Sequence, residues 1–510
     1  MEVNHFLKKL NWIICLFTIA VCTGFFYLYT SDCILTVHDD ILTYMQTRQG
    51  DIWQTAISDA KHGRICHIPL TYLLCLPYLP DNPVFVRLCS MAAISFDMLA
   101  LYSLIRRNID KTAGYLSSLL IISFAFVSNQ HNLFVSYIIG HQIPIGFVLL
   151  SLSSFTEYYK DKKNRYLLIS ALFLFLASVL YEACIAYIIL IAFIAMYSSD
   201  GNIFKNCYKI IYNMRFHILF TAAYLTIYII WRKMYPSDYS GAKFFWGNIP
   251  QSIITLIKYS FGMTPGLPLV AMLIKKYISI NEILKETDIT IFIVPLITAA
   301  SFYIAFPKIK KPKNSLMLIF LYITGMLIPN IIISFTTKYT DWTQSGSYSY
   351  VTSFYSYFMM IPLFLLILKC IFKGSIKKPC IIILSSLVFI VSLGACVNNT
   401  AWNIYFRKNL RKYEAFRNAV EDEYFDNLPS GTTIYIPDYS GIHNDMDITA
   451  SFASIYSSAD VKFENQGSEL DFSHPVVYMK YDAQTGDIMI SRIDSNFNDL
   501  EEAKCISSSD

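Results

Sequence analysis

Charged residues are scarce in this sequence. Asp, Glu, Lys and Arg make up 15% of its 510 residues, whereas 55% are hydrophobic and the mean hydropathy is +0.43. Soluble globular chains carry about 25% charged residues, so this composition excludes a soluble globular protein and predicts a chain that crosses a membrane many times. Aromatic residues form 16% of the chain, which fits interfacial aromatic belts and also fits a site that stacks on sugar rings.

Three further signatures are missing. The twelve cysteines lie mostly in apolar segments without CxxC spacing, so neither a zinc site nor a disulfide framework is indicated; a bridge between Cys33 and Cys66 stays open. The net charge of +4 comes without a basic tract, so no nucleic-acid partner is expected. No Ala-x-Ala site follows the first apolar segment behind Lys8 and Lys9, so this segment is predicted to be an uncleaved transmembrane helix.

Apolar segments long enough to span a bilayer, roughly 17 to 25 residues, recur along the chain. The run 166–198 is too long for one span and is expected to hold two helices that turn near Tyr181 and Glu182. The predicted fold class is an all-α polytopic membrane protein with about eleven transmembrane helices. The other nine spans are predicted at 10–30, 83–105, 112–128, 143–158, 216–232, 289–306, 315–335, 351–372 and 380–397.

The distribution of Lys and Arg predicts the orientation. Short loops rich in these residues face the cytoplasm, and eleven spans put those at 106–111, 160–165, 205–215, 308–313 and 373–378 on one side. The N-terminus is then cytoplasmic, whereas the loop 31–67 and the C-terminal residues lie outside. Residues 251–280 are apolar but contain Gly and Pro, and a re-entrant or interfacial hairpin fits them better than a crossing.

The composition changes after the last span. Residues 403–428 are predicted to form an amphipathic helix, 431–437 a strand, and 476–481 with 487–493 a β-hairpin. The sequence therefore predicts two domains, a transmembrane domain at 1–400 that carries the outer loop 31–67, and a small extracytoplasmic α/β domain at 401–510.

The outer loop begins with an adjacent pair of carboxylates. His38, Asp39 and Asp40 follow the first span directly and precede a helical pattern that starts at Ile41. One Asp is the candidate general base, and the other is expected to orient a ligand, because adjacent side chains rarely point the same way. The alternative is that one Asp only caps the following helix.

Cations close the same loop. Lys61 and Arg64 are predicted to bind a phosphate, Arg64 through its planar guanidinium, and Arg87 at the outer end of the second span is a further phosphate candidate. The alternative is that these cations anchor the loop to lipid headgroups. His38 and His62 carry ligand types that suit a divalent cation, but their spacing with the Asp pair does not indicate one. We therefore expect neither a metal nor another cofactor.

Polar and aromatic residues on the outer side, in this loop and in others, are candidates for binding a sugar or the second substrate that accepts it. The alternative is that they belong to turns and to the membrane interface. Asp97, deep in the second span, is expected to pair with another helix. The candidates are His38, His62, Tyr181, Glu182, Trp342, Gln344 and Tyr348.

The series Asp39-Asp40, Gly63-Arg64 and Tyr181-Glu182 resembles the GT-C superfamily of lipid-phosphosugar glycosyltransferases. Within it, the chain is most similar to bacterial serotype-converting O-antigen glucosyltransferases. The resemblance implies a polyprenyl-phosphate glucose donor, a lipid-linked O-antigen acceptor on the periplasmic face of the inner membrane, and a catalytic role for Asp39 or Asp40.

The residues fit that chemistry. An outer site lacks cytoplasmic nucleotide sugars, and a lipid-phosphate sugar carried across the membrane replaces them. One base and cations that hold the leaving phosphate suffice for a single inverting displacement. Two alternatives stay open: a lipid-linked polysaccharide polymerase, which the Asp pair and the C-terminal domain disfavour, and a flippase or transporter, in which related halves are more common.

Overall fold

The structure of the chain is a computed structural model. It describes residues 2–33, 38–50, 52–61, 67–80, 82–128, 133–197, 203–236, 241, 247–266, 270, 278–372, 376–421, 424–437, 460–464, 466–467, 470–481, 488–495 and 504–506. The chain divides into two compact units. The first comprises Met1–Ser31, Trp53–Pro77 and Asn82–Ala401, and the second comprises Asp32–Ile52, Tyr78–Asp81 and Trp402–Asp510.

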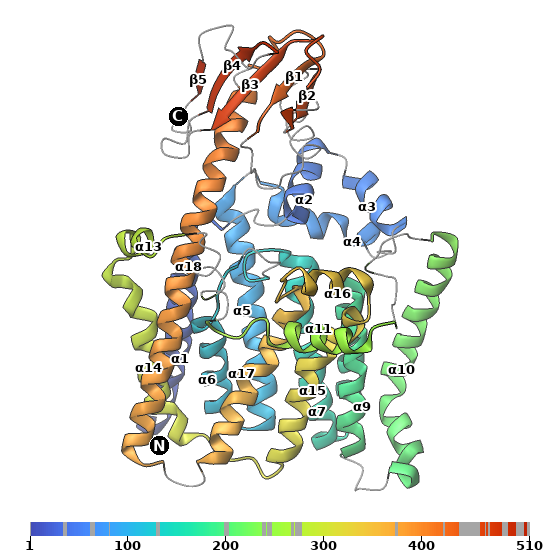
Figure 1. The fold of residues 1–510 in the computed structure, drawn as a ribbon. Coiled ribbons are helices and arrows are strands. Elements are labelled where there is room, and N and C mark those ends of the chain that lie inside the picture. The colour runs from blue at the N-terminus through green and yellow to red at the C-terminus, as the bar shows by residue number, and fades with distance from the viewer. Residues whose placement is uncertain are drawn as a thin grey trace. The chain divides into compact units, whose positions relative to one another are not determined.

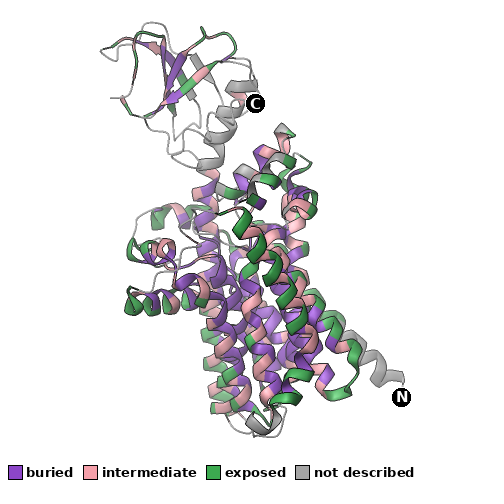
Figure 2. Cartoon of the chain, turned by 90° about the vertical axis from the view of Figure 1, so that its right-hand side faces the viewer, coloured by how far each residue is buried: buried purple, intermediate pink, exposed green. Residues whose placement is uncertain are grey.

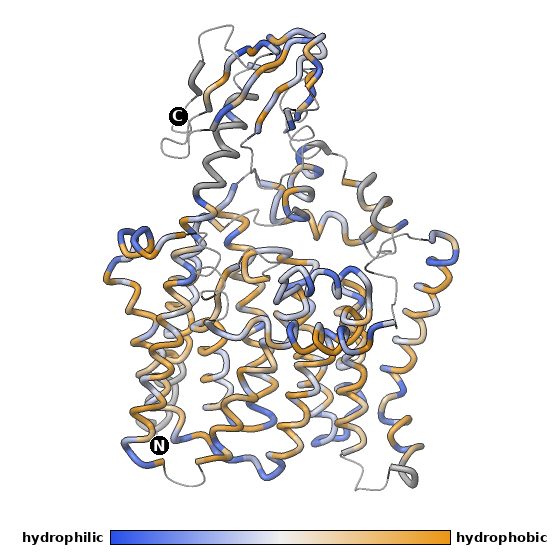
Figure 3. The backbone as a smooth tube through the Cα atoms, in the orientation of Figure 1, coloured by the Kyte–Doolittle hydropathy of each residue, from blue (hydrophilic) through white to orange (hydrophobic). Residues whose placement is uncertain are grey.

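The first unit is helical, and its long helices run side by side (Figure 1). Hydrophobic residues predominate along them and hydrophilic residues gather at their ends (Figure 3). Its helices are α1 (Glu2–Tyr29), α3 (Ile52–Lys61), α4 (His67–Cys75), α5 (Pro83–Asn108), α6 (Lys111–Ser123), η2 (Ile138–Gln142), α7 (Ile143–Asp161), α8 (Asn164–Leu180), η3 (Glu182–Tyr187), α9 (Ile188–Tyr197), α10 (Ile203–Met234), α11 (Ile249–Phe261), α13 (Ile280–Glu286), α14 (Ile293–Ala305), α15 (Ser315–Ser334), α16 (Thr337–Gln344), α17 (Val351–Ile371) and the first part of α18 (Lys378–Glu421).

Seven helices among the described residues are long and apolar enough to cross a membrane. This agrees with the predicted polytopic membrane protein, while the number of eleven spans stays a prediction. Shorter apolar helices are Ile13–Tyr29, Ile68–Tyr78, Asn164–Leu180 and Glu182–Met196. The seven long ones are Pro83–Asn108, Ile138–Asp161, Cys207–Met234, Ile289–Lys308, Ser315–Ser334, Val351–Ile371 and Lys378–Arg407.

Local sequence signals set the ends of α5 and α6. Asn82 caps α5, because its side chain accepts a hydrogen bond of 2.8 Å from the Val84 amide, and Pro83 fills the first helical position. Asp110 caps α6 in the same way through the Ala113 amide, also at 2.8 Å. These caps satisfy amides that a helix start leaves without intrahelical partners.

The predicted span 112–128 is wrong at its C-terminal end, because α6 stops at Ser123. The buried backbone that follows is satisfied from α18. Asn399 accepts a hydrogen bond from the Val127 amide at 2.8 Å and donates one to the Ala125 carbonyl at 3.0 Å, and Asn398 donates to the Val127 carbonyl at 2.8 Å. Side chains of α18 thus satisfy backbone groups of Ala125 and Val127 in a non-helical segment inside the bundle.

Buried residues concentrate where the helices of the first unit face one another (Figure 2). The closest packing joins α5 with α7, α7 with α8, and α15 with α17.

The predicted turn of the run 166–198 is confirmed, because α8 ends at Leu180 and η3 begins at Glu182. In the predicted hairpin 251–280, α11 ends at Phe261 and is too short to span; residues 267–269 and 271–277 lie outside the described part.

The second unit contains α2 (His38–Gln49), the C-terminal part of α18 and a five-stranded sheet of order β2-β1-β3-β4-β5. β1 (Thr432–Tyr435) pairs in parallel with β2 (Val461–Glu464) and β3 (Val476–Tyr481). β4 (Ile488–Ile493) pairs antiparallel with β3 and with β5 (Lys504–Ile506). The strand predicted within 431–437 and the predicted hairpin are therefore confirmed.

The predicted helix 403–428 is confirmed as far as Glu421 and is continuous with the last span. α18 continues without a break from the last span to Glu421, because the sequence has neither Gly nor Pro between Gly394 and Pro429 to end it. Asn403 on this helix joins the segment after α1, since its side chain accepts from the Asp32 amide at 2.6 Å and donates to the Asp32 carboxylate at 3.0 Å.

Candidate functional site

The end of α3 is held against the end of α10. The indole Nε1 of Trp231 donates a hydrogen bond of 2.6 Å to the Ala60 carbonyl, which belongs to the last turn of α3. Lys61, the last residue of α3, is exposed. This contact brings the predicted phosphate-binding Lys61 to the part of α10 where Arg232 and Lys233 lie.

Tyr228 lies near a carboxylate and a cation at this end of α10. Glu182 and Arg232 both lie within electrostatic range of the Tyr228 hydroxyl, and they act on it with opposite sign. Glu182 is exposed and Arg232 is half-buried. The predicted Glu182 thus shares its surroundings with an arginine that sequence reasoning did not single out.

Next to Glu182, a series of tilted aromatic rings begins with Tyr181. The ring of Tyr181 lies 4.6 Å from that of His141 and 5.8 Å from that of Tyr355, and His141 lies 4.9 Å from Tyr137. The Tyr355 hydroxyl donates a hydrogen bond of 2.6 Å to the His141 carbonyl. Tyr137 has a left-handed backbone (φ 52°) directly before η2, the element that carries His141. Rings fixed in this way form a rigid surface that suits stacking on a sugar.

A second aromatic cluster surrounds the start of α17, where α11 and α16 lie across the long helices (Figure 1). Trp342 packs edge-on against Tyr339 at 5.5 Å, and Tyr339 and Tyr350 share a hydrogen bond of 3.0 Å between their hydroxyls. Lys338 lies 4.7 Å above the Trp342 ring. Burial raises the pKa of Tyr259 to about 12, although a hydrogen bond with Ser347 opposes the shift. The Tyr259 hydroxyl donates a hydrogen bond of 3.3 Å to the Tyr339 carbonyl, which joins α11 to α16.

The predicted sugar-binding residues of this region differ in exposure. Trp342 and Tyr348 are half-buried, whereas Gln344 at the end of α16 is exposed. Tyr350 directly precedes α17 and Tyr355 lies in its second turn, so the two aromatic clusters both involve the N-terminal end of this helix.

Arg87 belongs to the same end of the bundle. It is half-buried in the second turn of α5. Its neighbour Val86 packs with Ala93 against Ile138 and Ile139 of η2, the element that carries His141. Arg106 and Arg107 occupy the last turn of α5, so Arg87 is the cation on the side of the aromatic rings.

The two candidate carboxylates lie in the second unit. α2 begins at His38, so Asp39 and Asp40 both fall in its first turn rather than before the helix, where negative charge favours the helix dipole. Asp39 is exposed, whereas Asp40 is only 4% exposed. As expected for neighbours, they point in different directions. Arg48 at the other end of α2 donates to the carbonyl groups of Tyr78 and Leu79 at 2.6 and 2.7 Å.

Some predicted site residues lie outside the described part. These are His62, Gly63 and Arg64, and the side chain of His38. Within the part of the chain that the structure describes, no three His, Cys, Asp or Glu side chains gather where a metal ion would bind. Asp97 is fully buried and packs against Gly146 of α7, where an added methyl would stand 2.5 Å from Oδ1.

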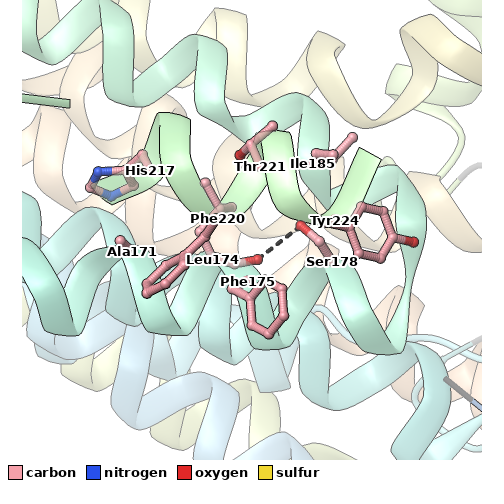
Figure 4. A pocket seen from close by; sticks show the side chains of 9 residues that line it. All are labelled: Ala171, Leu174, Phe175, Ser178, Ile185, His217, Phe220, Thr221 and Tyr224. Carbon is pink, nitrogen blue, oxygen red and sulfur yellow. Dashed lines mark hydrogen bonds between the residues drawn. The ribbon is translucent and has the colours of Figure 1, made fainter. Parts of the chain in front are cut away.

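A small cavity between α8 and α10 is a structural gap rather than a substrate site. Its volume is about 10 Å³, roughly what one water molecule needs. His217 lies at one end of it (Figure 4) and is held by a hydrogen bond of 2.9 Å between Nε2 and the Ser170 hydroxyl. The cavity is lined by Ala171, Leu174, Phe175, Ser178, Ile185, His217, Phe220, Thr221 and Tyr224.

Sequence reasoning missed His141, Tyr355 and Arg232. His141 and Tyr355 meet Tyr181 from elements far away in the chain, and no local spacing connects them. Arg232 did carry a signal, since it follows an apolar span on the predicted outer side, where cations are uncommon among short loops.

No protein-family model and no curated protein matches the chain. Among solved structures, it is similar to the apo form of an oligosaccharyltransferase from Archaeoglobus fulgidus, with a TM-score of 0.35 and 12% sequence identity, over 87% of this chain and 64% of that chain. The chain thus spans less than two thirds of that neighbour. A likeness of this degree does not define the activity of this chain.

Proposed function

We propose that this protein transfers a hexosyl residue, most simply glucose, from a polyprenyl-phosphate sugar to a lipid-linked glycan such as O-antigen. One observation carries the proposal. The Ala60 carbonyl, next to Lys61, is bonded to Trp231, next to Arg232, while Tyr228 one turn earlier on α10 lies within electrostatic range of Glu182, whose neighbour Tyr181 packs against the ring of His141. A lipid-phosphate sugar needs this combination, because its chain stays in the membrane while its phosphate and sugar reach the surface.

In the proposed reaction, an acceptor hydroxyl attacks the anomeric carbon of the donor sugar. The bond between that carbon and the phosphate oxygen breaks, its electron pair leaves with the phosphate, and the configuration inverts. Cations stabilise the departing phosphate, and a carboxylate takes the proton of the hydroxyl. We assign the proton to Asp39, because it is exposed and a base must reach its substrate, and assign a positioning role to the buried Asp40.

The proposed setting is the inner membrane of a bacterium, with the N-terminus in the cytoplasm and the C-terminal strands in the periplasm. It rests on the distribution of Lys and Arg among the short loops. Glucosyl transfer to O-antigen on that face would change the lipopolysaccharide of the cell, which is the basis of serotype conversion.

The test is a transfer assay with detergent-extracted protein, polyprenyl-phosphate glucose and a lipid-linked acceptor. Asp39→Asn keeps the size and hydrogen bonding of the side chain but removes its basicity, so we expect turnover to fall at least about a hundredfold while donor binding persists. Asp40→Asn is the matched variant, with a milder loss expected.

Near-normal turnover of Asp39→Asn would refute its role as the base, and Glu182→Gln would then be the next variant to assay. The proposed activity itself would be contradicted if the wild-type protein bound the donor but transferred sugar to none of the lipid-linked acceptors offered. Expression and membrane insertion are compared for all variants, so that a folding defect is not mistaken for a catalytic one.

A further inference from the structure

Cations gather at the junction where α7 ends and where α8 and α10 begin. Lys162 follows α7 with a left-handed backbone (φ 55°), and its ammonium lies 4.2 Å from the centre of the Tyr159 ring. The guanidinium of Arg215 on α10 lies 4.2 Å from the centre of the Tyr212 ring and donates a hydrogen bond of 2.8 Å to the side chain of Asn164, the first residue of α8. Each cation is thus fixed over an aromatic ring.

Asn213 joins α10 to the end of α7. Its side chain accepts a hydrogen bond of 2.8 Å from the Tyr158 hydroxyl and donates one of 3.1 Å to the Tyr159 hydroxyl. Lys209 lies one turn before Asn213 on α10, within electrostatic range of Lys162. We call three residues the junction cations: Lys162, Lys209 and Arg215.

The acidic residues near the junction are paired with other cations. Asp161 lies 3.8 Å from Lys163, and Glu157 lies 3.3 Å from Arg107. Within the described ranges of the chain, no carboxylate forms a salt bridge with a junction cation. Burial and the charge of another junction cation lower the pKa of Lys162. A bound anion would relieve this repulsion between like charges.

The remaining cations at this end of the bundle have other surroundings. Lys160 donates a hydrogen bond of 2.9 Å to a backbone carbonyl of α5, Arg165 lies 4.9 Å above the ring of its own neighbour, and Arg106 is exposed at the end of α5. The basic loop 308–313 belongs to another junction, because one of its amides donates a hydrogen bond of 2.7 Å to Asp110, directly before α6. These cations add to the positive field, whereas the junction cations lie together without a carboxylate.

Exposed apolar residues begin next to the junction cations. On α8, Leu168, Leu172 and Leu176 follow one another at one turn on the same face and are 38%, 41% and 43% exposed. On α10, which stands at the edge of the bundle (Figure 1), Ile211 and Leu219 are 52% and 58% exposed. The surface therefore combines cations at the helix ends with hydrocarbon along the helices, which matches the two parts of a phospholipid.

We propose that the junction cations bind the headgroup of an anionic phospholipid that carries two phosphates, with its acyl chains along α8 and α10. Three cations without a carboxylate favour two phosphates over one, and basic pockets between transmembrane helices suit such headgroups. The adjoining apolar residues favour a lipid over a soluble phosphate. Only 11% of the apolar part of α10 is buried, the smallest share among the seven long apolar helices described, so the lipid would hold α10 against α8.

The lipid site is separate from the proposed sugar transfer, because Arg232 lies in the last turn of α10 and the junction cations lie at the beginning of this helix. The test is native mass spectrometry of the full-length protein, delipidated in detergent and titrated with cardiolipin. We expect its Kd to be at least about fivefold lower than that of phosphatidylglycerol at equal phosphate concentration, because a second phosphate engages a further cation. Inorganic pyrophosphate, which lacks acyl chains, should not displace bound cardiolipin.

Variants of exposed residues separate the junction from the general basic surface. Lys162→Gln and Lys209→Gln each remove one charge from an exposed side chain, so the fold tolerates them, and each should raise the Kd of cardiolipin about fivefold. Lys162→Arg keeps the charge and should keep most of the affinity. Lys311→Gln, in the exposed part of the loop 308–313, is the matched control and should leave the Kd unchanged within about twofold.

Equal weakening by Lys311→Gln and Lys209→Gln would overturn the proposal and reduce the binding to general attraction by a basic surface. Equal Kd values for cardiolipin and phosphatidylglycerol would overturn the site for two phosphates, and displacement by pyrophosphate would show a site for soluble phosphate instead of lipid. The readout is lipid binding alone, so a negative result leaves the proposed sugar transfer untouched, and a failure of sugar transfer leaves the lipid site untouched.

Discussion

Gly262 is the position where an added methyl group should most disturb the second aromatic cluster, the one around Tyr339, Trp342 and Tyr350. It ends α11 with an ordinary φ of −59°, so its backbone does not require glycine. An added Cβ would overlap the backbone oxygen of Tyr348 and stand 2.9 Å from the Cα of Ser349. These neighbours are backbone atoms and cannot turn aside as a flexible side chain does. Gly262→Ala must therefore push α11 away from the segment that precedes α17.

The expected cost of this overpacking is about 1–3 kcal/mol. Domains of 150–250 residues lose about 2–4 °C in Tm for each kcal/mol, and larger ones lose less, so we expect the apparent Tm to fall by about 2–6 °C. The measurement is thermal unfolding of the detergent-solubilised protein at a fixed scan rate, because membrane proteins seldom unfold reversibly. Sugar transfer should fall as well, since Tyr348 and Trp342 belong to the displaced region.

Gly394→Ala on α18 is the matched control. No atom lies within 4 Å of the Cβ that it would add, and Ala is favoured over Gly inside a helix by about 1 kcal/mol. Its Tm should be unchanged or slightly higher. Equal Tm values for Gly262→Ala and wild type would refute the close approach of α11 to Tyr348.

Two further outcomes are expected. Trp231→Phe keeps an aromatic ring but removes the hydrogen bond to the Ala60 carbonyl, which is worth about 1 kcal/mol or fivefold in an opening equilibrium. Trypsin should therefore cut after Lys61 about five times faster in Trp231→Phe than in the control Trp53→Phe, whose lost indole bond to Tyr72 is exposed. Equal cutting rates would contradict the attachment of α3 to α10 through Trp231. Hydrogen bonds from Ser473 lower the pKa of Asp471, so its stabilising effect is present above its ordinary pKa and is lost as the pH falls through the lowered value. Protection of β3 from hydrogen exchange, corrected for intrinsic rates, should therefore differ between wild type and Asp471→Asn at pH 7 and converge well below pH 4; a constant difference would refute this linkage.

Most of the helical fold could be predicted from local sequence. Long apolar runs, caps such as Asn82 and breaks such as the one before Glu182 are read directly from the chain, and the hairpin of β3 and β4 follows from alternation and a short turn. The two short strands β2 and β5 could not be predicted, because neither stands in a longer alternating run, whereas the equally short β1 lies in the run 431–437. Their formation depends on neighbouring strands rather than on their own propensity.

The candidate site could be predicted only in part. Tyr181 and Glu182 are conspicuous because a polar pair interrupts an apolar run, and Lys61 closes a polar loop. Their partners are not visible in the same way. His141 meets Tyr181 through a turn at Tyr137 with positive φ, a conformation uncommon for a non-glycine residue, and no nearby sequence pattern indicates it.

Polar side chains inside the spans explain why the remaining features escape sequence reasoning. The apolar sequence after Ser123 would continue α6, but the backbone at Val127 is satisfied by Asn399 of α18 instead. His217 is held by Ser170 on another helix, and Asp97 packs against backbone rather than against the cation that its charge suggests. Each of these residues is recognisable as costly in an apolar segment. Its partner, however, lies tens to hundreds of residues away, so the sequence identifies the polar group and only the packing of the helices determines what that group does.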